Sequence, residues 1–302
     1  MTERPAFIGV DWGTSNARFM LIARNGVVLD EKQGVGIGRI DDAKRIESIC
    51  FDTVKPWLSA GADVPILMAG MVGSNIGWRT AGYVGTPASF DDLAADITRF
   101  EARGTFCASV PGVETIRHDG AADVMRGEET QIFGVADGGD QLFCLPGTHS
   151  KWAKVSGGSI TGFHTAQTGE LLDVIGQHSI LLNPRRPVSA QVGAAFQSGV
   201  DRVRTSVLGL ESLMFTVRSQ QISGVLPAAQ ADSYFAGIAI GCEIRSALAL
   251  YSAPVRLTLV GSANLTALYA SALQTFGWES ERIDGRTASV AGLTKIAQRM
   301  AA

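Results

Sequence analysis

The sequence predicts an α/β protein that is divided into two domains. At 302 residues the chain is longer than one ordinary domain, and two domains of about 150 residues are expected for that length. Hydrophobic residues make up 46% of the chain and charged residues 18%, which is typical of an enzyme with a large buried core. Apolar runs of strand length alternate with segments of helical spacing, so strands and helices should follow one another along the chain.

Composition also excludes several classes of partner. The net charge is −3 and there is no long basic run, which argues against nucleic acid or an anionic membrane and favours a small metabolite. The four cysteines are far apart in the sequence, so they are expected to be reduced thiols in the core. Without a signal peptide or an apolar span of about 18 residues, the protein is expected in the cytoplasm.

The first predicted element is a β-hairpin with a polar tip. An apolar run over residues 7–10 ends in Asp11, and a second apolar run covers residues 18–22. Between them lie Gly13, Thr14 and Ser15, whose N–H and hydroxyl groups suit a polyphosphate, while Asp11 suits a hydrated Mg²⁺. An ordinary β-turn uses the same residue types and is the alternative. The tip is not a Walker loop, because no Gly-Lys-Ser/Thr follows it.

The next segments predict a helix packed against a sheet. Residues 34–38 are expected to form a flexible glycine-rich link, residues 43–58 an amphipathic helix, and residues 64–69 a buried strand. The loop after that strand carries an aromatic and a cationic side chain and lies where parallel sheets bind ligands. Substrate contacts are therefore expected from Gly70, Met71, Ser74 and Trp78. A plain surface connection is the alternative. A helix over 90–103 and a strand over 105–110 follow.

A cluster of charges marks the start of the next predicted helix. Asp123, Glu128 and Glu129 are candidates for a base that takes a proton from a substrate hydroxyl, and Arg126 is a candidate partner for a substrate carboxylate. A carboxylate among apolar neighbours would have a raised pKa, which suits proton transfer. The alternative is that these acidic residues only favour the helix dipole. Gly127 is a candidate break in this helix.

The pattern of the first hairpin occurs a second time. The apolar run 141–145 is followed by a polar tip and by strands over 152–155 and 159–163. Two such candidate phosphate-binding hairpins in one chain arise by chance far less often than one. The second tip supplies further candidate nucleotide contacts, namely Gly147, Thr148, His149, Ser150 and Lys151, the last as a point charge for phosphate.

The second half of the chain predicts further helices and one more strand. A helix capped by Thr168 comes first, then a surface helix over 196–215 and a buried helix over 237–250. A buried strand over 255–260 follows.

The end of that strand is a tight turn of small residues. Gly261 and Ser262 are candidate contacts for a nucleoside ring, although every α/β unit has such a turn. Helices over 266–276 and 289–300 complete the chain.

Together these motifs resemble those of the sugar kinase, hexokinase and actin-like ATPase superfamily, and within it the 2-dehydro-3-deoxygalactonokinase family. The resemblance rests on stretches that cover most of the chain, namely Gly9 to Asn16, Gly70 to Ser74, Asp123 to Gln131, Leu145 to Trp152, Thr168 to Leu171 and His178 to Leu181. It implies two actin-like (ribonuclease H-like) domains, at 1–139 and 140–302, with a central cleft. The final helix is a candidate to pack back on the first domain.

The resemblance also implies an activity. Family members use ATP to phosphorylate the 6-hydroxyl of 2-dehydro-3-deoxygalactonate, a keto-deoxy sugar acid of galactonate catabolism. By this resemblance Asp11 holds Mg²⁺, Asp123 ranks first as the base, and Thr168 and Glu170 contact the substrate. Cys144 to Pro146 stand where the superfamily often has an Asp, so Asp11 is left as the single metal ligand.

Two other functions are compatible with these motifs. An actin-like phosphatase of nucleotides or polyphosphate would use water in place of the substrate hydroxyl, and the residues around Glu129 resemble that group too. A non-catalytic sugar-binding sensor would be expected to carry a DNA-binding appendage or a damaged Asp11, and the sequence has neither. The oligomeric state is open, with a homodimer as one option.

Overall fold

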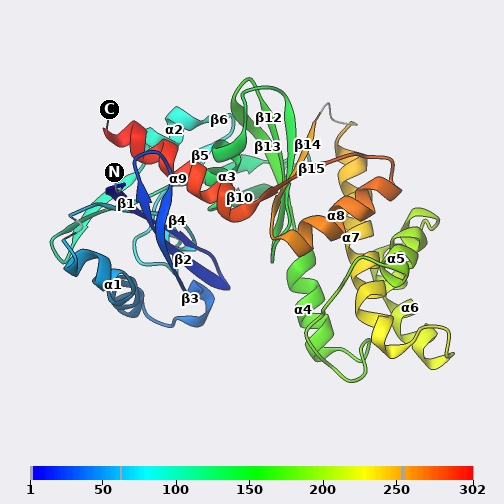
Figure 1. The fold of residues 1–302 in the computed structure, drawn as a ribbon. Coiled ribbons are helices and arrows are strands. Elements are labelled where there is room, and N and C mark those ends of the chain that lie inside the picture. The colour runs from blue at the N-terminus through cyan, green and yellow to red at the C-terminus, as the bar shows by residue number, and fades with distance from the viewer. Residues whose placement is uncertain (1–2, 62, 253–255, 302) are drawn as a thin grey trace. The chain divides into compact units, whose positions relative to one another are not determined.

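The computed structural model describes residues 3–61, 63–252 and 256–301, and the contacts within it divide the chain into two units. Unit 1 comprises the described residues of Met1–Gly139, Lys154–Phe163 and Gly285–Ala302. Unit 2 comprises those of Asp140–Ala153 and His164–Asp284. The C-terminal helix is thus grouped with the N-terminal part of the chain (Figure 1).

Unit 1 is built on a six-stranded mixed sheet. In sheet order its strands are β3 (Val28–Val35), β2 (Asn16–Ala23), β1 (Pro5–Trp12), β4 (Ile66–Gly70), β8 (Thr105–Ser109) and β7 (Thr98–Ala102). Strands β1 to β3 are antiparallel neighbours, β4 pairs in parallel with β1, β8 pairs in parallel with β4, and β7 is antiparallel to β8. A smaller sheet contains β10 (Ala122–Met125), β9 (Gly112–Ile116) and β5 (Tyr83–Gly85).

The sheet of unit 2 repeats this strand order. Its strands are β15 (Glu281–Asp284), β14 (Leu257–Gly261), β11 (Gln141–Leu145), β12 (Ser150–Ser156) and β13 (Ser159–Ala166). The order 13-12-11-14-15 corresponds to 3-2-1-4-8 in unit 1. The end of the β12–β13 hairpin is grouped with unit 1, where β13 pairs with β6 (Ala88–Ser89). Two mixed sheets with corresponding strand orders confirm the α/β fold and the repeated hairpin.

Helices cover both sheets. Unit 1 has α1 (Ala43–Ser59), α2 (Phe90–Ala95), α3 (Glu128–Val135) and α9 (Gly285–Ala301), and unit 2 has α4 (Thr168–His178), α5 (Ala194–Arg204), α6 (Leu210–Ile222), α7 (Ala231–Leu250) and α8 (Ala263–Thr275). The stretch Ala228–Leu250 is long and apolar enough to cross a membrane, but 67% of its most apolar window is buried inside the protein. α7 is therefore the core helix of unit 2.

Strand β1 uses its two faces for different helices, because alternate side chains of a strand point to opposite faces. Every second side chain over Ile8–Trp12 is buried in a core shared with α1. On the other face, Ser289 of α9 donates a hydrogen bond to Asp11, and a Cβ at Gly9 would lie 3.2 Å from Leu293 of α9. α9 therefore lies close along β1 and reaches the carboxylate at its end.

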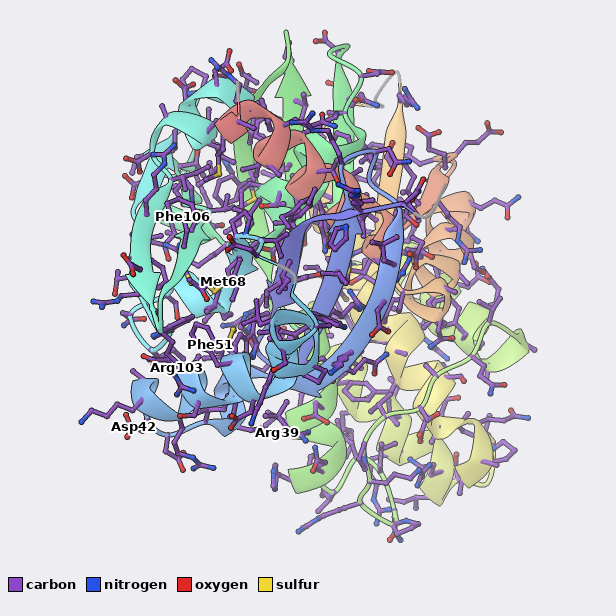
Figure 2. The ribbon with its side chains drawn as sticks, turned by 60° about the vertical axis from the view of Figure 1, so that its left-hand side comes forward. Arg39, Asp42, Phe51, Met68, Arg103 and Phe106 are labelled. Carbon is purple, nitrogen blue, oxygen red and sulfur yellow. The ribbon has the colours of Figure 1, made fainter. Side chains whose placement is uncertain are left out.

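The predicted helix over 90–103 is wrong. A capping box at Ser89 starts α2, but the helix ends at Ala95 and the chain then forms the β7–β8 hairpin. Arg103 turns that hairpin with a φ of 48°, and its guanidinium lies 5.0 Å from the ring of Phe51 on α1. Figure 2 shows Arg103 beside Phe51 at this edge of the unit.

Three other expectations need correction. The link expected over 34–38 is partly strand, because β3 continues to Val35 and pairs with β2. The single helix expected over 196–215 is two helices, α5 and α6, separated by the segment 205–209. Thr168 is the first helical residue of α4 and makes no capping bond, since its buried side chain binds a glutamate of α7. The first residue of the strand expected over 255–260 lies outside the described residues.

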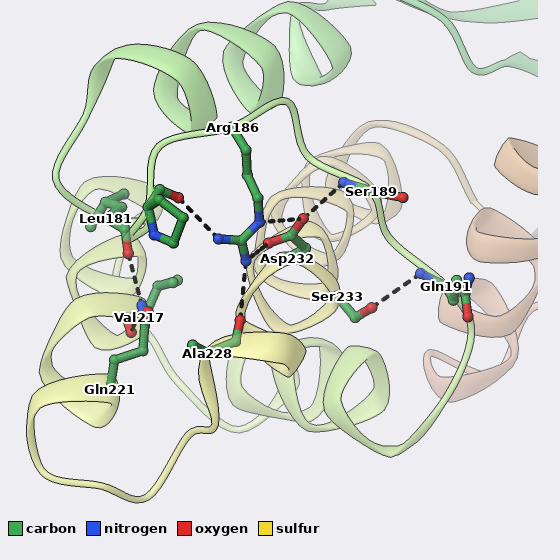
Figure 3. Close-up of polar contacts among 10 residues, drawn as sticks. Leu181, Arg186, Ser189, Gln191, Val217, Gln221, Ala228, Asp232 and Ser233 are labelled. Carbon is green, nitrogen blue, oxygen red and sulfur yellow. Dashed lines mark hydrogen bonds and ion pairs between the residues drawn. The ribbon is translucent and has the colours of Figure 1, made fainter.

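The segment between α4 and α5 is fixed to the start of α7 by one ion pair. Arg186 Nε and Nη2 both donate to the carboxylate of Asp232, which also accepts a hydrogen bond of 3.0 Å from Ser189 N–H. The same guanidinium donates to the carbonyls of Pro184 and Ala228 (Figure 3). Asp232 is buried, so Arg186 supplies most of the compensation for its charge.

Replacing Arg186→Met should lower the free energy of unfolding of the protein by about 3 kcal/mol, because it leaves the buried Asp232 carboxylate without its cation. Chemical denaturation followed by circular dichroism measures this change. The control is Arg204→Met, which removes an exposed ion pair to Asp201 and should cost less than about 1 kcal/mol. Equal effects of the two substitutions would contradict this account of Arg186.

Candidate functional site

Asp11 lies at the end of β1, where the sequence predicts it. Its side chain is 17% exposed, and one oxygen, Oδ2, accepts hydrogen bonds from Ser289 Oγ at 2.8 Å and from Arg18 at 3.3 Å. The other oxygen has no hydrogen-bond partner among the described residues. Asp11 therefore presents one oriented carboxylate oxygen beside the polar tip.

The tip after Asp11 is shaped by the segment that follows β3. The carbonyls of Gly13, Thr14 and Ser15 accept hydrogen bonds of 3.0 to 3.1 Å from backbone N–H groups of residues 36–38. Gly36 is required for this approach, because a Cβ there would lie 2.2 Å from the Thr14 oxygen. The N–H groups of Thr14 and Ser15 have no acceptor among the described residues. With their carbonyls occupied and their N–H groups available, these residues can bind an anion.

Helices α3 and α9 orient the side chain of Asp11. Gln131 Nε2 donates to Ser289 Oγ at 3.0 Å, and Ser289 in turn donates to Asp11. The two helices cross closely because Gly292 meets the backbone of Thr130, where a Cβ would lie 2.0 Å from the carbonyl oxygen. Sequence reasoning missed Ser289, because nothing in its own segment distinguishes it from other small residues of an amphipathic helix.

The loop after β4 lies next to the start of α3. Gly70 has a φ of 92° and pairs with Trp12 in the sheet, one residue beyond Asp11. Gly127 has a φ of 104°, and a Cβ there would lie 3.1 Å from the Gly70 Cα. Ser74, another predicted substrate contact, is buried and donates to the carbonyl of Met71 at 2.7 Å.

Trp78 does not face outward as the sequence suggested. Its ring packs edge-on between Phe51 and Phe100, with centroid distances of 6.0 and 5.1 Å. The side chain is only half-buried but belongs to the core of unit 1. An aromatic residue in a glycine-rich loop is equally compatible with either role, which is why the sequence could not separate them.

The Arg126 side chain is also buried rather than exposed. It is 8% exposed, its Nη2 donates to the carbonyls of Ala81 and Gly82, and its guanidinium stacks 4.2 Å above the ring of Tyr83. Its Nε and Nη1, like the hydroxyl of Ser109, are buried without a hydrogen-bond partner among the described residues. Arg126 therefore holds the loop around residue 81 and keeps one edge of its guanidinium unused.

The three candidate bases do not share one helix. Asp123 lies in β10, opposite Thr115 of β9, and α3 begins only at Glu128, because Gly127 breaks the backbone path. Gly127 is thus the break that the sequence made a candidate, and Asp123 lies outside the helix. Glu128 is half-buried and accepts a hydrogen bond from Arg126 N–H at 3.1 Å.

Glu129 is completely buried at the start of α3. Both of its oxygens accept hydrogen bonds from Gly127 N–H, at 2.7 and 2.9 Å, and one accepts from the Thr130 hydroxyl. Burial raises the pKa of Glu129 to about 8, the neighbouring Glu128 adds to the rise, and these hydrogen bonds oppose it. This carboxyl is thus poised to change its charge near neutral pH.

The second tip is covered by the start of α4. Gly169 lies against Gly147, where a Cβ would be 2.2 Å from the Gly147 oxygen, and the Thr148 carbonyl accepts from Glu170 N–H at 2.9 Å. His149 Nε2 and Glu170 Oε2 are 2.7 Å apart. The N–H groups of residues 147–149 have no acceptor among the described residues. The second tip therefore repeats the arrangement of the first.

Lys151 follows this tip and is buried. It is 5% exposed, and the described residues provide no hydrogen bond or ion pair for its ammonium group. An ammonium group without an internal partner is available to an anionic ligand. The phosphate role of Lys151 stays a prediction.

Ser150 and Thr168 are held by a carboxylate that sequence reasoning missed. Glu243 of α7 is buried and accepts hydrogen bonds from Trp152 Nε1 at 2.8 Å and from the Tyr269 hydroxyl at 2.6 Å. Ser150 and Thr168 also donate to it, and Ser150 contacts Tyr269 at 2.9 Å. Burial raises the pKa of Glu243, whereas these donors lower it. The only sequence signal was an acidic residue inside a largely apolar helix.

The small-residue turn after β14 lies next to the second tip. β14 runs parallel to β11, and Gly261 is close to Pro146, whose carbonyl oxygen would be 3.4 Å from a Cβ at Gly261. Ser262 caps α8 by accepting from Leu265 N–H. Unit 2 therefore brings together three predicted nucleotide contacts: the second tip, Lys151 and this turn.

The described residues contain no group of three or more His, Cys, Asp or Glu side chains that could hold a metal ion. Asp11 fits a metal bound in another way, because Mg²⁺ is often held by one or two carboxylates, water and substrate phosphates. Its oxygen without a partner is the available ligand.

Comparison with known proteins gives a consistent result. A family model for 2-keto-3-deoxy-galactonokinase matches residues 11–296. A Rhizobium meliloti protein named "Probable 2-dehydro-3-deoxygalactonokinase DgoK1" is 37% identical over 99% of this chain and 98% of its own length. The 2-dehydro-3-deoxygalactonokinase of Escherichia coli is 33% identical over the whole of both chains.

Solved structures extend the comparison. A crystal structure from Sinorhizobium meliloti, described under the same enzyme name, has a TM-score of 0.87 at 35% identity and covers 97% of this chain and 96% of its own. An activator of 2-hydroxyisocaproyl-CoA dehydratase from Clostridium difficile, with bound ADPNP, has a TM-score of 0.52 at 11% identity over 97% and 94% of the two chains. This distant likeness concerns the fold, which is that of the actin-like ATPases.

The raised pKa of Glu129 should make stability depend on pH. The folded-state value of about 8 lies above the ordinary 4.5, so the stabilising contribution is complete below about pH 4.5 and is lost as the pH rises through 8. Relative to Glu129→Gln, the wild type should lose at least about 2 kcal/mol of unfolding free energy between pH 5 and 9, at about 1.4 kcal/mol per pKa unit.

Urea denaturation at several pH values measures this difference. The control is Glu114→Gln, which makes the same change at an exposed position and should leave the pH profile unaltered. Parallel profiles for the wild type and Glu129→Gln would show that Glu129 ionises at its ordinary pKa.

Proposed function

Because the chain belongs to the 2-keto-3-deoxy-galactonokinase family, we propose that it transfers the γ-phosphate of ATP to the 6-hydroxyl of 2-dehydro-3-deoxygalactonate. The observation that carries the proposal is the pair of polar tips, each with its backbone N–H groups available and each followed by a strand. Such donors are suited to phosphate oxygens, and phosphoryl transfer depends mainly on positioning and charge neutralisation. The proposed compartment is the cytoplasm.

Asp11 is the proposed ligand of Mg²⁺, which would neutralise charge on the phosphates when bound. Lys151 is the proposed cation for the phosphates at the second tip, together with the backbone of Gly147, Thr148 and His149. The turn at Gly261 and Ser262 is proposed to pack on the nucleoside. Ser150 contributes through its hydrogen bonds with Tyr269 and Glu243, because its hydroxyl is buried.

The acceptor is proposed to bind near the loop that begins at Gly70 and Met71. The unused edge of the Arg126 guanidinium is the proposed partner for the substrate carboxylate, and reaching it requires the loop around residue 81 to move. Thr168 and Glu170 are proposed substrate contacts at the start of α4. Ser74 and Trp78 act by shaping the loop, since both side chains are engaged within unit 1.

Among the candidate bases, the geometry supports Glu128. It starts α3, is half-buried, and lies next to Gly127, which contacts Gly70 beside the end of β1. Glu129 fixes the Gly127 backbone, because both of its oxygens accept from the Gly127 N–H. Asp123 remains a candidate base because the chain resembles sugar kinases. The proposed base takes the proton of the 6-hydroxyl as that oxygen attacks phosphorus.

A coupled assay with ATP, Mg²⁺ and a panel of keto-deoxy sugar acids tests the function. The expected result is ADP formation that depends on 2-dehydro-3-deoxygalactonate. ATP hydrolysis that is indifferent to the sugar acid would favour an actin-like phosphatase instead.

The substitution Asp11→Asn should lower kcat by about a hundredfold or more, equivalent to about 3 kcal/mol, because it removes the carboxylate that holds the metal. The fold should persist, since Asn can still accept from Ser289. Steady-state kinetics at several Mg²⁺ concentrations measure the loss, with the exposed Asp52→Asn as the matched control. Near wild-type turnover in the first variant would refute the metal assignment.

The base can be identified by comparing Glu128→Gln, Glu129→Gln and Asp123→Asn, with ATP binding as the control. Glu128→Gln should lower kcat by 10²-fold or more, the usual contribution of a general base. The other two should retain more turnover. If Asp123→Asn loses kcat while Glu128→Gln keeps it, the ranking taken from sugar kinases is the right one. If all three variants remain active, the base lies outside this segment.

A further inference from the structure

Helix α6 and its flanking loops expose an unusual number of large apolar side chains. Val207 is 100% exposed, Leu208 52%, Phe215 58%, Ile222 69% and Val225 70%. These five residues, called the α6 surface below, come from 19 consecutive positions of unit 2. Single exposed apolar residues are normal, but several within one short segment of a folded protein point to an interaction site.

The α6 surface is not needed for the fold of unit 2. The opposite side of the helix carries Leu213 and Val217, which are buried in a cluster with α5 and α7. In Figure 1, α6 lies beside α7 within this unit. The exposed residues therefore contribute no packing that the described structure accounts for.

Charges flank the apolar residues on the same helix face. Glu211, Phe215, Arg218 and Ile222 are spaced by four, three and four residues, so they form one stripe along α6. Neither Glu211 nor Arg218 makes an ion pair or a hydrogen bond among the described residues. The stripe thus reads acidic, apolar, basic and apolar from one end to the other.

The two charges of this stripe are complementary when a second copy of α6 lies antiparallel to the first in one register. A two-fold axis perpendicular to α6, passing between Met214 and Phe215, would place Glu211 of one copy opposite Arg218 of the other. The same axis would place the Phe215 side chains of the two copies side by side. Two-fold dimers use one surface patch twice, so a stripe of this kind meets their requirement.

We propose that the α6 surface is the contact between two copies of this chain in a homodimer with antiparallel α6 helices. The charges set the register, because reversing either one alone would place like charges opposite each other. The patch is small for a permanent assembly, so the dimer is expected to dissociate in the micromolar range. The proposal does not depend on the enzymatic function.

Sedimentation velocity between 1 and 100 µM tests the proposal. The wild type should shift from monomer to dimer over this range, and Phe215→Asp should stay monomeric while it keeps its circular dichroism spectrum. The matched control is Ile116→Asp, which places the same charge at a position of unit 1 that is 71% exposed. A wild-type protein that is monomeric throughout would overturn the proposal, as would a dimer that Phe215→Asp leaves intact.

A charge exchange tests the register independently. Glu211→Arg and Arg218→Glu should each raise the dissociation constant about tenfold or more, and the double variant should restore dimerisation. Failure of the double variant to recover, with all three variants folded, would rule out the antiparallel register. A pattern in which neither single variant weakens the dimer would overturn the proposed contact as a whole.

Discussion

The arrangement of unit 1 depends on the close crossing of α3 and α9. Gly292 and Gly134 bring the two helix backbones into contact, where a Cβ at Gly134 would lie 2.3 Å from the Ala288 oxygen. This crossing places Ser289 between Gln131 of α3 and Asp11 of β1. The last helix of the chain therefore orients a carboxylate that belongs to the first strand. Both glycines therefore help to place Ser289 beside Asp11.

Unit 2 holds its tip by a different physical means. A single buried carboxylate, Glu243, accepts hydrogen bonds from Ser150, Trp152 and Thr168, and from Tyr269. These donors come from β12, α4 and α8, so one carboxyl group on α7 fixes three separate segments. A buried carboxylate is expensive unless its hydrogen bonds are complete, which makes this arrangement intolerant of small shifts. The tip and the start of α4 consequently share one anchor.

The sequence was sufficient for features that depend on local patterns. Both hairpins, their tips, α1, α7 and the turn at Gly261 follow from apolar runs and small residues that stand next to one another. The sequence was not sufficient where a contact between residues far apart in the chain determines the local structure. The spacing of residues 90–103 suits a helix, but pairing with β8 turns its second half into strand. Ser289 and Glu243 are 278 and 91 residues from the groups they hold, Asp11 and Trp152, and no local pattern marks them.

The two tips also differ in charge. Unit 1 presents Asp11, whereas the corresponding strand of unit 2 ends in Cys144, Leu145 and Pro146, so no carboxylate stands at its tip. What stands there is Lys151, buried and without a partner among the described residues. The two tips therefore present charges of opposite sign: the carboxylate of unit 1 suits a cation, whereas the ammonium group of unit 2 suits an anion.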